Sequence, residues 1–457
     1  MGSKITLAEI CTDISYGYTA SATAKPVGPK FLRITDIQGG KVNWENVPYC
    51  EIDEKDSLKY LLQDGDIVIA RTGNSTGENF IFSSNTKVVF ASYLIRFRID
   101  PKKANPKFIW LQMRTPQWWS FIDSVKTGSA QAGANAKVLG LYEVELPERK
   151  IQDHIADIGF NLLKKQDINS KINQTLEQMS QTLFKSWFVD FDPVIDNALD
   201  AGNPIPEALQ TRTKLRQKAR NSTDFKPLPA EICSLFPSEF EETELGWVPK
   251  GWNISLAGEE FIIKGGSTPS TANVDFWING TIYWTSPKDL TGNESKVLLD
   301  TAKKITPLGL AKISSGLLPI DTVLMSSRAP IGYLALNKVP MAINQGYIAI
   351  PSAKHLSPEY TIYWLDNIMD DIKGIAGGTT FAEISKSAFK TIKLLIPSSD
   401  IITEFSRVTR NHFDKVVQNT KEIDSLTNLR DTLLPKLISG ELSLEDLPDL
   451  TTDTEAA

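Results

Sequence analysis

The sequence repeats itself at a spacing of about 250 residues, and this repeat constrains the fold more than any other feature. Four short matches mark it: Ile5-Thr6-Leu7-Ala8 with Ile254-Ser255-Leu256-Ala257, Thr127-Gly128-Ser129 with Gly377-Gly378-Thr379, Leu146-Pro147 with Ile396-Pro397, and Thr182-Leu183-Phe184 with Thr432-Leu433-Leu434. A fixed period indicates a duplicated structural unit. Two similar units predict an approximately two-fold object, whose natural partner is duplex DNA with two half-sites or a pair of identical subunits.

The bulk composition is that of a multidomain globular protein. The chain has 457 residues, which predicts two to four domains, with 41% hydrophobic and 23% charged residues. No apolar run approaches the roughly 18 residues that span a bilayer, and the amino terminus lacks a signal-peptide core. Cys11, Cys50 and Cys233 have no paired spacing, which favours reduced thiols in a cytoplasmic protein.

The net charge of −6 argues against solitary binding to nucleic acid, but the distribution of charge weakens that argument. Acidic residues without any base follow Lys436, and a second acidic stretch spans residues 231–244. The rest of the chain therefore carries a small positive surplus, which permits a local basic face. If the chain binds DNA, we expect partner proteins to supply much of the phosphate contact.

Each repeat is predicted to contain a strand-rich part and then a long helix, which gives an α+β fold class. Strands are expected at 66–70 and 88–97 in the first repeat, and at 321–325 and 342–350 in the second, with helices after Asn105-Pro106 and Ser357-Pro358. The predicted segments are two strand-rich domains at 1–147 and 248–397, two long helices at 148–188 and 398–440, a connector of irregular backbone at 189–247, and an acidic tail at 441–457.

Apolar residues at alternating spacings of four and three mark both long helices, and such a heptad seam predicts a coiled coil. Each helix would contain about 36 residues and extend roughly 54 Å. Two such helices in one chain should pair with each other. Asn169 and Asn419 fall at equivalent seam positions, where a buried Asn pair would fix the register. The alternative is that both lie on a solvated face.

The usual motifs of catalysis are absent from the sequence. It contains no Gly-x-x-x-x-Gly-Lys phosphate loop, no Gly-x-Gly-x-x-Gly after a strand, and no Asn-Pro-Pro-aromatic tetrapeptide. His154, His355 and His412 lack metal-ligand spacing, and no serine or cysteine has the setting of a nucleophile. We therefore expect a non-catalytic chain that holds no metal and no cofactor of its own.

Three stretches carry a family resemblance: QTLFKSWFVDFDPV at 181–194, LFPSEF with LGWVPKGW at 235–252, and LPKLISGEL at 434–442. They resemble the central and carboxy-terminal regions of the specificity subunits of type I restriction–modification systems. The resemblance covers nearly the whole chain. The strand-rich parts match only in outline, because recognition domains of this family vary in sequence.

The resemblance implies that each strand-rich part is a target recognition domain reading one half of a bipartite DNA sequence. The two long helices would pair in antiparallel fashion as a ruler between the half-sites. It also implies two methyltransferase subunits that use S-adenosylmethionine, and restriction subunits that use ATP and Mg. Two other functions stay open, a stand-alone sequence-specific DNA-binding protein and a coiled-coil scaffold without nucleic acid. The target bases do not follow from the sequence.

Candidate DNA contacts are polar side chains in loops that follow the predicted strands, because base edges and phosphates are bound by such groups. In the first domain they are Arg33, Thr35, Arg71, Thr72, Asn74, Ser129, Gln131 and Asn135. In the second domain they are Thr285, Ser286, Lys288, Ser327, Arg328, Asn344, Gln345, Thr379 and Thr380. For each residue, the alternative is an ordinary surface or turn position.

Two aromatic pairs invite a base-stacking interpretation, but we expect both to pack within protein. Trp118 and Trp119 follow Thr115-Pro116 at a helix break and are predicted to lie in the core. Trp187 and Phe188 end the first long helix, and they are predicted to pack beside the connector or against a methyltransferase subunit.

Overall fold

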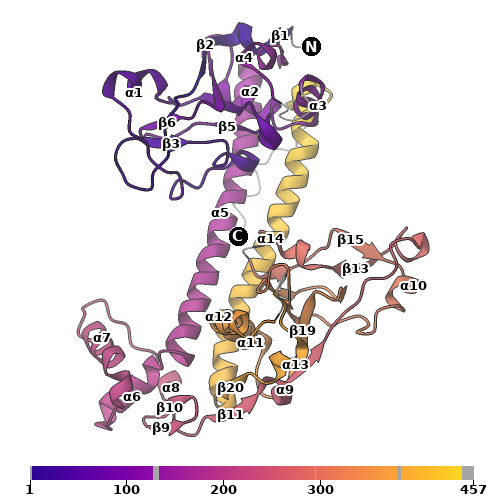
Figure 1. Cartoon of the computed structure of the whole chain (residues 1–457). Coiled ribbons are helices and arrows are strands. Elements are labelled where there is room, and N and C mark those ends of the chain that lie inside the picture. Colours follow the sequence, from indigo (N-terminus) through magenta and orange to yellow (C-terminus); the bar gives the residue numbers. More distant parts are fainter. Residues whose placement is uncertain (1–2, 127–132, 294, 378–381, 445–457) are drawn as a thin grey trace. The chain divides into compact units, whose positions relative to one another are not determined.

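The computed structural model describes residues 3–126, 133–293, 295–377 and 382–444 (Figure 1). The chain forms two compact units, which we call unit 1 (Met1–Asp167 with Ile423–Ala457) and unit 2 (Ile168–Glu422). Two long helices, α5 (Arg149–Phe188) and α14 (Ser399–Ser439), contribute residues to both units. Unit 1 therefore combines two segments that are distant in sequence, whereas unit 2 is one continuous segment.

The described part of unit 1 contains three small sheets. The strands are β1 (Ser3–Thr6), β2 (Cys11–Tyr16), β3 (Lys30–Leu32), β4 (Asp66–Ala70), β5 (Asn79–Ile81), β6 (Val88–Phe90), β7 (Leu94–Ile99) and β8 (Glu143–Leu146). The short helices are α1 (Glu54–Tyr60), α2 (Pro106–Gln112), α3 (Pro116–Val125) and α4 (Ala136–Leu139). The largest sheet has the antiparallel order β2-β7-β4-β5, while β3 pairs with β6 in parallel and β1 pairs with β8 antiparallel.

Strand β4 spans the predicted range 66–70. It is buried on both faces, which accounts for its nearly continuous apolar sequence. Ile67 and Ile69 pack into one hydrophobic cluster, and Val68 and Ala70 pack into another. The predicted strand at 88–97 is wrong in one respect, since a turn at 91–93 divides it into β6 and β7. Helix α2 begins as predicted after Asn105, whose side chain accepts a hydrogen bond from the Lys107 N–H.

Unit 2 contains the corresponding strand-rich part. Its strands are β11 (Asn253–Leu256), β12 (Phe261–Lys264), β13 (Ile282–Thr285), β14 (Val297–Leu298), β15 (Lys303–Ile305), β16 (Val323–Ser326), β17 (Leu334–Asn337), β18 (Met341–Ile343), β19 (Tyr347–Ala353) and β20 (Lys393–Ile396). Its helices are α9 (Ala257–Glu260), α10 (Pro307–Leu310), α11 (Pro358–Asn367), α12 (Met369–Gly374) and α13 (Lys386–Lys390). The sheets have the orders β12-β19-β16-β17-β14, β15-β13-β18 and β11-β20.

The connector differs from the predicted irregular backbone. It contains α6 (Asp192–Ala201), α7 (Gln210–Arg220), α8 (Ala230–Cys233) and a hairpin of β9 (Phe240–Thr243) with β10 (Gly246–Pro249). Three arginines at four-residue spacing on α7 form ion pairs with three aspartates at the same spacing on α6: Arg212 with Asp192, Arg216 with Asp196, and Arg220 with Asp200. The prolines and glycines that suggested a loop instead bound helices, since proline stands in the first turn of α6 and glycine caps its end.

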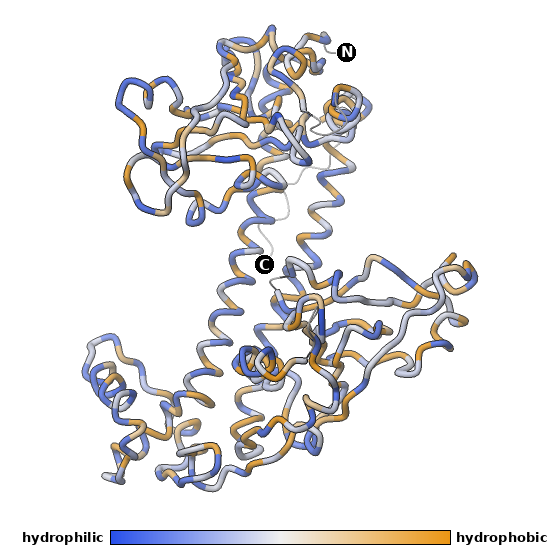
Figure 2. The backbone as a smooth tube through the Cα atoms, in the orientation of Figure 1, coloured by the Kyte–Doolittle hydropathy of each residue, from blue (hydrophilic) through white to orange (hydrophobic). Residues whose placement is uncertain are grey.

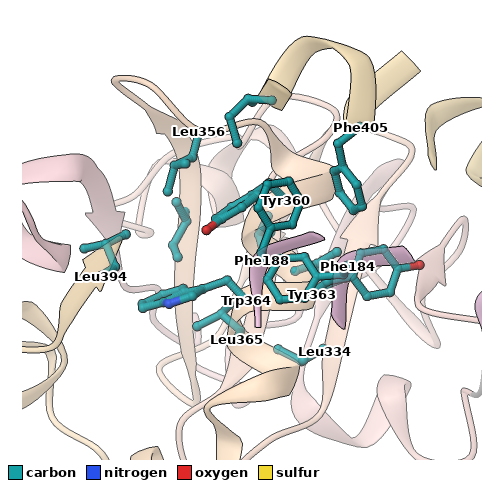
Figure 3. Close-up of a cluster of buried hydrophobic side chains, with 14 of the residues drawn as sticks. Phe184, Phe188, Leu334, Leu356, Tyr360, Tyr363, Trp364, Leu365, Leu394 and Phe405 are labelled. Atoms are coloured by element: carbon teal, nitrogen blue, oxygen red, sulfur yellow. The ribbon is translucent and has the colours of Figure 1, made fainter. Parts of the chain in front are cut away.

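An aromatic cluster forms the centre of the unit 2 core (Figure 3). Phe405 of α14 is fully buried, and its ring lies 5.1 Å from the Phe188 ring and 5.9 Å from the Phe184 ring, between centroids. Trp187 is also buried, with its ring 5.1 Å from that of Phe236 in the connector. The prediction that Trp187 and Phe188 pack beside the connector is confirmed.

The other tryptophan prediction concerns unit 1. Trp118 is fully buried, and its indole N–H donates to the carbonyl oxygen of Gly77 at 2.9 Å. Its ring lies 4.9 Å from the Tyr142 ring in an edge-to-face arrangement. Trp118 is therefore a core residue as predicted, while Trp119 is half-buried and packs against the same cluster.

Helices α5 and α14 have 40 and 41 residues, and polar and apolar residues alternate around both (Figure 2). Within unit 2, side chains hydrogen-bond across the pair: Asn169 to Glu422 at 2.9 Å, Asn173 to Asn419 at 2.8 Å, and Ser180 to His412 at 2.8 Å. Residue numbers rise along α5 as they fall along α14. These two segments therefore run in opposite directions.

Asn169 and Asn419 are 2% and 1% exposed, so the alternative of a solvated face is wrong. The two residues do not bond to each other, as a simple Asn pair would require. Because the segments are antiparallel, equivalent positions of the repeat do not face each other. Asn169 instead donates to Glu422, and Asn419 donates to Asn173. Buried polar pairs at these seam positions favour one register over its neighbours.

We expect the burial of His412, which contacts Ser180, to make helix pairing sensitive to pH. Burial lowers the pKa of His412 below its usual value of 6.5. A histidine with a depressed pKa binds its proton more readily in the unfolded chain, so its contribution to stability is complete above pH 6.5 and declines as the pH falls. We expect the wild type to lose more unfolding free energy than His412→Gln between pH 7.5 and 5.5, as measured by urea denaturation. Parallel losses in the two proteins would contradict this assignment.

Candidate nucleic-acid interface

In unit 1 the structure brings two of the predicted loops together at the end of β4. The carbonyl oxygen of Arg71 accepts a hydrogen bond from the Ala134 N–H at 3.0 Å, and Thr72 forms a β-bridge with Gly133. Asn135 lies next in this segment, where its side chain caps α4 by accepting from the Val138 N–H at 3.0 Å. Ser129 and Gln131 lie outside the described residues.

Arg71 is held in place by its backbone and by its side chain. Its N–H donates to the carbonyl oxygen of Tyr93 at 3.1 Å, and its Nε donates to the carbonyl oxygen of Ser92 at 3.0 Å. The guanidinium carbon lies 5.2 Å from the centre of the Tyr16 ring and 5.8 Å from the centre of the Tyr93 ring. Both tyrosines are substantially exposed, at 43% and 54%. An arginine with two partly exposed aromatic neighbours is thus presented at the surface.

The remaining candidates of unit 1 have different settings. Arg33 forms a two-point ion pair with Asp36, at 2.9 Å from Nε and 2.8 Å from Nη2, and this hydrogen bonding raises the pKa of Arg33. Thr35 and Asn74 are exposed. The turn that contains Arg33 and Thr35 adjoins the loop that contains Asn74, because Gln38 Nε2 donates to the Ser75 hydroxyl at 3.1 Å.

In unit 2 the loop after β16 has the same connections. The N–H of Ser327 donates to the carbonyl oxygen of Gly346, and its own carbonyl accepts from the Ile384 N–H. These two bonds make Ser327 the structural equivalent of Arg71. Arg328 is then the equivalent of Thr72, and it forms a β-bridge with Glu383 as well as an ion pair at 3.7 Å. Its side chain is 38% exposed.

Two candidates of unit 2 are buried. Thr285 is 0% exposed, and its hydroxyl lies 3.0 Å from the hydroxyl of Tyr347, while Ser327 is 3% exposed. Neither side chain therefore offers an accessible group to a base edge. Ser286 stabilises the turn that follows β13, since its N–H donates to the Asp289 carboxylate at 2.8 Å.

The other unit 2 candidates lie nearer the surface. Lys288 and Gln345 are exposed, and the Gln345 side chain accepts a hydrogen bond from the Thr268 hydroxyl at 2.8 Å. The Asn344 side chain accepts from the Gly346 N–H at 2.8 Å, which shapes the turn before β19. Thr379 and Thr380 lie outside the described residues.

Sequence reasoning missed Tyr16 and Tyr93, the two rings beside Arg71. The sequence does contain a signal near Tyr16, because the next residue is Gly17 and a glycine can mark a close approach of two backbone segments. A Cβ at Gly17 would lie 2.3 Å from the carbonyl oxygens of Phe90 and Ala91, so only glycine permits this close approach of the backbones. Gly266 has the same role in unit 2, where a Cβ would lie 1.8 Å from the carbonyl oxygen of Ile343.

Across the described ranges, no three His, Cys, Asp or Glu side chains gather as ligands for a metal ion. The three cysteines carry free thiols, as predicted, and burial raises the pKa of Cys11 to about 12. None of the described helices combines the length and apolar character that a bilayer crossing requires.

Comparison with known sequences identifies relatives of both repeats. The family model described as type I restriction modification DNA specificity domain matches residues 17–178 and 249–424. The type I restriction enzyme HindI specificity subunit of Haemophilus influenzae is 27% identical over 470 residues, covering 96% of this chain and 99% of that protein. The MjaIX specificity subunit of Methanocaldococcus jannaschii is 34% identical over 187 residues, covering 40% of this chain and 43% of that one.

The fold is shared with a solved structure. The crystal structure of the type I restriction–modification system S subunit from M. genitalium covers 96% of both chains with a TM-score of 0.55 and 15% sequence identity. At this identity the similarity shows the fold alone.

Proposed function

The chain belongs to the type I restriction–modification DNA specificity family, and from this premise we propose that it reads a bipartite DNA target. The strand-rich part of unit 1 would bind one half-site, and that of unit 2 would bind the other. The observation that carries the proposal is the duplication itself: the family model matches twice, and β4 and β16 are followed by loops with equivalent backbone hydrogen bonds.

The second element of the proposal is the spacer. Helices α5 and α14 would pair as an antiparallel coiled coil that sets the separation of the half-sites, as a rigid element between two DNA-binding domains must do. The hydrogen bonds between α5 and α14 within unit 2 support this pairing. So does the Gln166–Thr427 bond within unit 1, at 2.8 Å.

The third element is assembly with catalytic partners. Two methyltransferase subunits using S-adenosylmethionine would modify the target, and restriction subunits using ATP and Mg would cleave unmodified DNA. The chain would supply recognition without chemistry of its own. This assignment is supported by the names of its relatives, which are called specificity subunits of type I restriction enzymes.

Methylome sequencing tests the proposal. The chain is expressed with its proposed methyltransferase partner in a host that lacks DNA methylation. We expect a bipartite motif with one modified adenine in each half, present only when both proteins are made. A soluble, associated pair that methylates nothing would instead favour the coiled-coil scaffold. Specific binding by the isolated chain would favour a stand-alone DNA-binding protein.

Replacing Arg328 with alanine is expected to weaken recognition of the second half-site and leave the first unchanged. Arginine contacts to bases are worth about 1–3 kcal/mol, and we expect about 1 kcal/mol because Arg328 must exchange Glu383 for DNA. The readout is the binding of duplexes mutated in one half-site or the other. Arg407→Ala is the matched control, since Arg407 is an exposed arginine of α14 paired with Glu404. Equal binding by Arg328→Ala and wild type would remove Arg328 from the interface.

A further inference from the structure

We propose that Tyr16 and Tyr93 hold the guanidinium of Arg71 so that its terminal nitrogens bind a pair of hydrogen-bond acceptors in the first half-site. The acceptors would be N7 and O6 of a guanine or two oxygens of a phosphate, which present the same chemistry to an arginine. The inference rests on the proposed function and adds the residues and the ligand chemistry of one contact.

The first argument is the charge of Arg71. Among the arginines, all of which are described, every one except Arg71 and Arg114 has a carboxylate oxygen within ion-pair distance: Arg33, Arg96, Arg98, Arg149, Arg212, Arg216, Arg220, Arg328, Arg407, Arg410 and Arg430. Arg114 donates to the carbonyl oxygen of Gly39, and burial lowers its pKa. Within the part of the chain that the structure describes, no carboxylate lies within ion-pair distance of Arg71, which is half-buried at the surface.

The second argument is that the guanidinium is positioned in advance. The Nε–H group already donates to the carbonyl oxygen of Ser92, which leaves Nη1 and Nη2 as donors without a hydrogen-bond partner among the described residues. One N–H group of Nη1 and one of Nη2 lie parallel in the guanidinium plane, a geometry that matches paired acceptors. Contacts with the rings of Tyr16 and Tyr93 limit rotation of the side chain. A side chain that is ordered before binding loses less entropy on binding.

The third argument concerns the tyrosines. The Tyr16 hydroxyl accepts a hydrogen bond from the Ala136 N–H at 3.1 Å, which fixes its ring against the start of α4. The Tyr93 hydroxyl has no hydrogen-bond partner among the described residues, and the residue is 54% exposed. Within the described structure, the contact of the Tyr93 side chain with Arg71 is therefore made by the ring. This makes Tyr93→Phe a matched control, because it keeps the ring and removes only the hydroxyl.

At the equivalent described positions, unit 2 lacks this arrangement. The backbone hydrogen bonds place Ser327 where unit 1 has Arg71, and Gly346 where unit 1 has Tyr93. The equivalence of Gly266 and Gly17, both in close contact with a neighbouring strand, places Gly265 where unit 1 has Tyr16. All three side chains of unit 1 are thus different in unit 2, as expected if Arg71, Tyr16 and Tyr93 act together. Mutation of these three residues should therefore affect binding of the first half-site alone.

The test uses the complex of the full chain with its methyltransferase, and duplexes that carry the target found by methylome sequencing. We expect Arg71→Ala to weaken binding about 5- to 150-fold, the equivalent of about 1–3 kcal/mol. Tyr93→Leu should weaken it about two- to fivefold, as loss of an exposed cation–π contact predicts, whereas Tyr93→Phe should bind as wild type. Altering the second half-site of the duplex should reduce the affinity of every variant by the same factor as it does for the wild type. This equal reduction would show that the variants are folded.

The two sources of acceptors give different results. For a guanine contact, Arg71→Ala and Arg71→Lys lose discrimination at one base pair of the first half-site. For a phosphate contact, Arg71→Lys retains most affinity, and Arg71→Ala weakens all duplexes equally while the salt dependence falls by about one counterion. Unchanged affinity and discrimination for Arg71→Ala would overturn the inference and leave the proposed function intact. A wild-type complex that recognises no bipartite motif would instead overturn the proposed function.

Discussion

Replacing Phe405 with alanine is expected to lower the free energy of unfolding of unit 2 by about 3–5 kcal/mol, the range for a large aromatic residue removed from a core. Phe405 is 0% exposed, and its ring contacts those of Phe184, Trp187, Phe188, Tyr360 and Tyr363. These rings come from α5 and α11, whereas Phe405 belongs to α14 (Figure 3). Alanine would leave a cavity that surrounding rings of fixed shape cannot fill by small movements.

Urea denaturation followed by tryptophan fluorescence measures this effect, since Trp187 and Trp252 belong to the same cluster. Leu429→Ala is the control on the same helix, because Leu429 is 49% exposed and its loss should change stability by about 0.5 kcal/mol or less. A Phe405→Ala protein that unfolds at the wild-type urea concentration would show that the cluster does not hold α14 against α5.

Replacing Arg98 with methionine is expected to cost about 3 kcal/mol in unit 1, because it leaves a buried carboxylate without its cation. Asp66 is 1% exposed and accepts two hydrogen bonds from Arg98, both at 2.7 Å, and one from the Gln63 N–H. We expect the lower end of the usual range because the Arg98 side chain is 26% exposed, and water can enter where it stood. Arg407→Met, at an exposed pair, should cost less than 1 kcal/mol.

A double-mutant cycle separates the two sides of this pair. Asp66→Asn removes the buried charge, so Arg98→Met should cost much less in its presence than in the wild type. Equal costs of Arg98→Met in both backgrounds would show that loss of packing, and not the unpaired charge, is responsible. Unfolding free energies from urea denaturation provide all four corners of the cycle.

The sequence was a good guide wherever a pattern is local. The Asp66–Ala70 strand, the caps at Asn105 and Ser357, and the long helices are encoded by runs, caps and spacings within a few residues. The connector was misjudged because proline and glycine also stand at the two ends of a helix. The feature that favours helices over irregular backbone is the pairing of arginines on α7 with aspartates on α6. The paired residues are 20 positions apart in the sequence.

The loops that hold the candidate DNA contacts could be predicted from the sequence, but the role of each residue in them could not. Arg33 and Arg71 look alike in sequence, yet Arg33 has Asp36 as a partner and Arg71 has two aromatic rings. In the sequence, Thr285 was a candidate for DNA contact. In the structure it is buried, and its hydroxyl contacts that of Tyr347, which lies 62 residues later in the chain. Tertiary contacts of this kind decide whether a polar group can meet a ligand, and no local pattern records them.

The pairing of first and last strands has a consequence for how such chains diversify. Ser3 of β1 lies opposite Leu146 of β8, and Asn253 of β11 lies opposite Ile396 of β20. Paired strands lie about 4.8 Å apart, so each strand-rich domain begins and ends at one place. A domain whose two ends are adjacent can be exchanged as a block by recombination. The new domain needs only a first and a last strand that pair in the same register. Under the proposed function, exchange of one such domain would replace the recognition of one half-site in a single step.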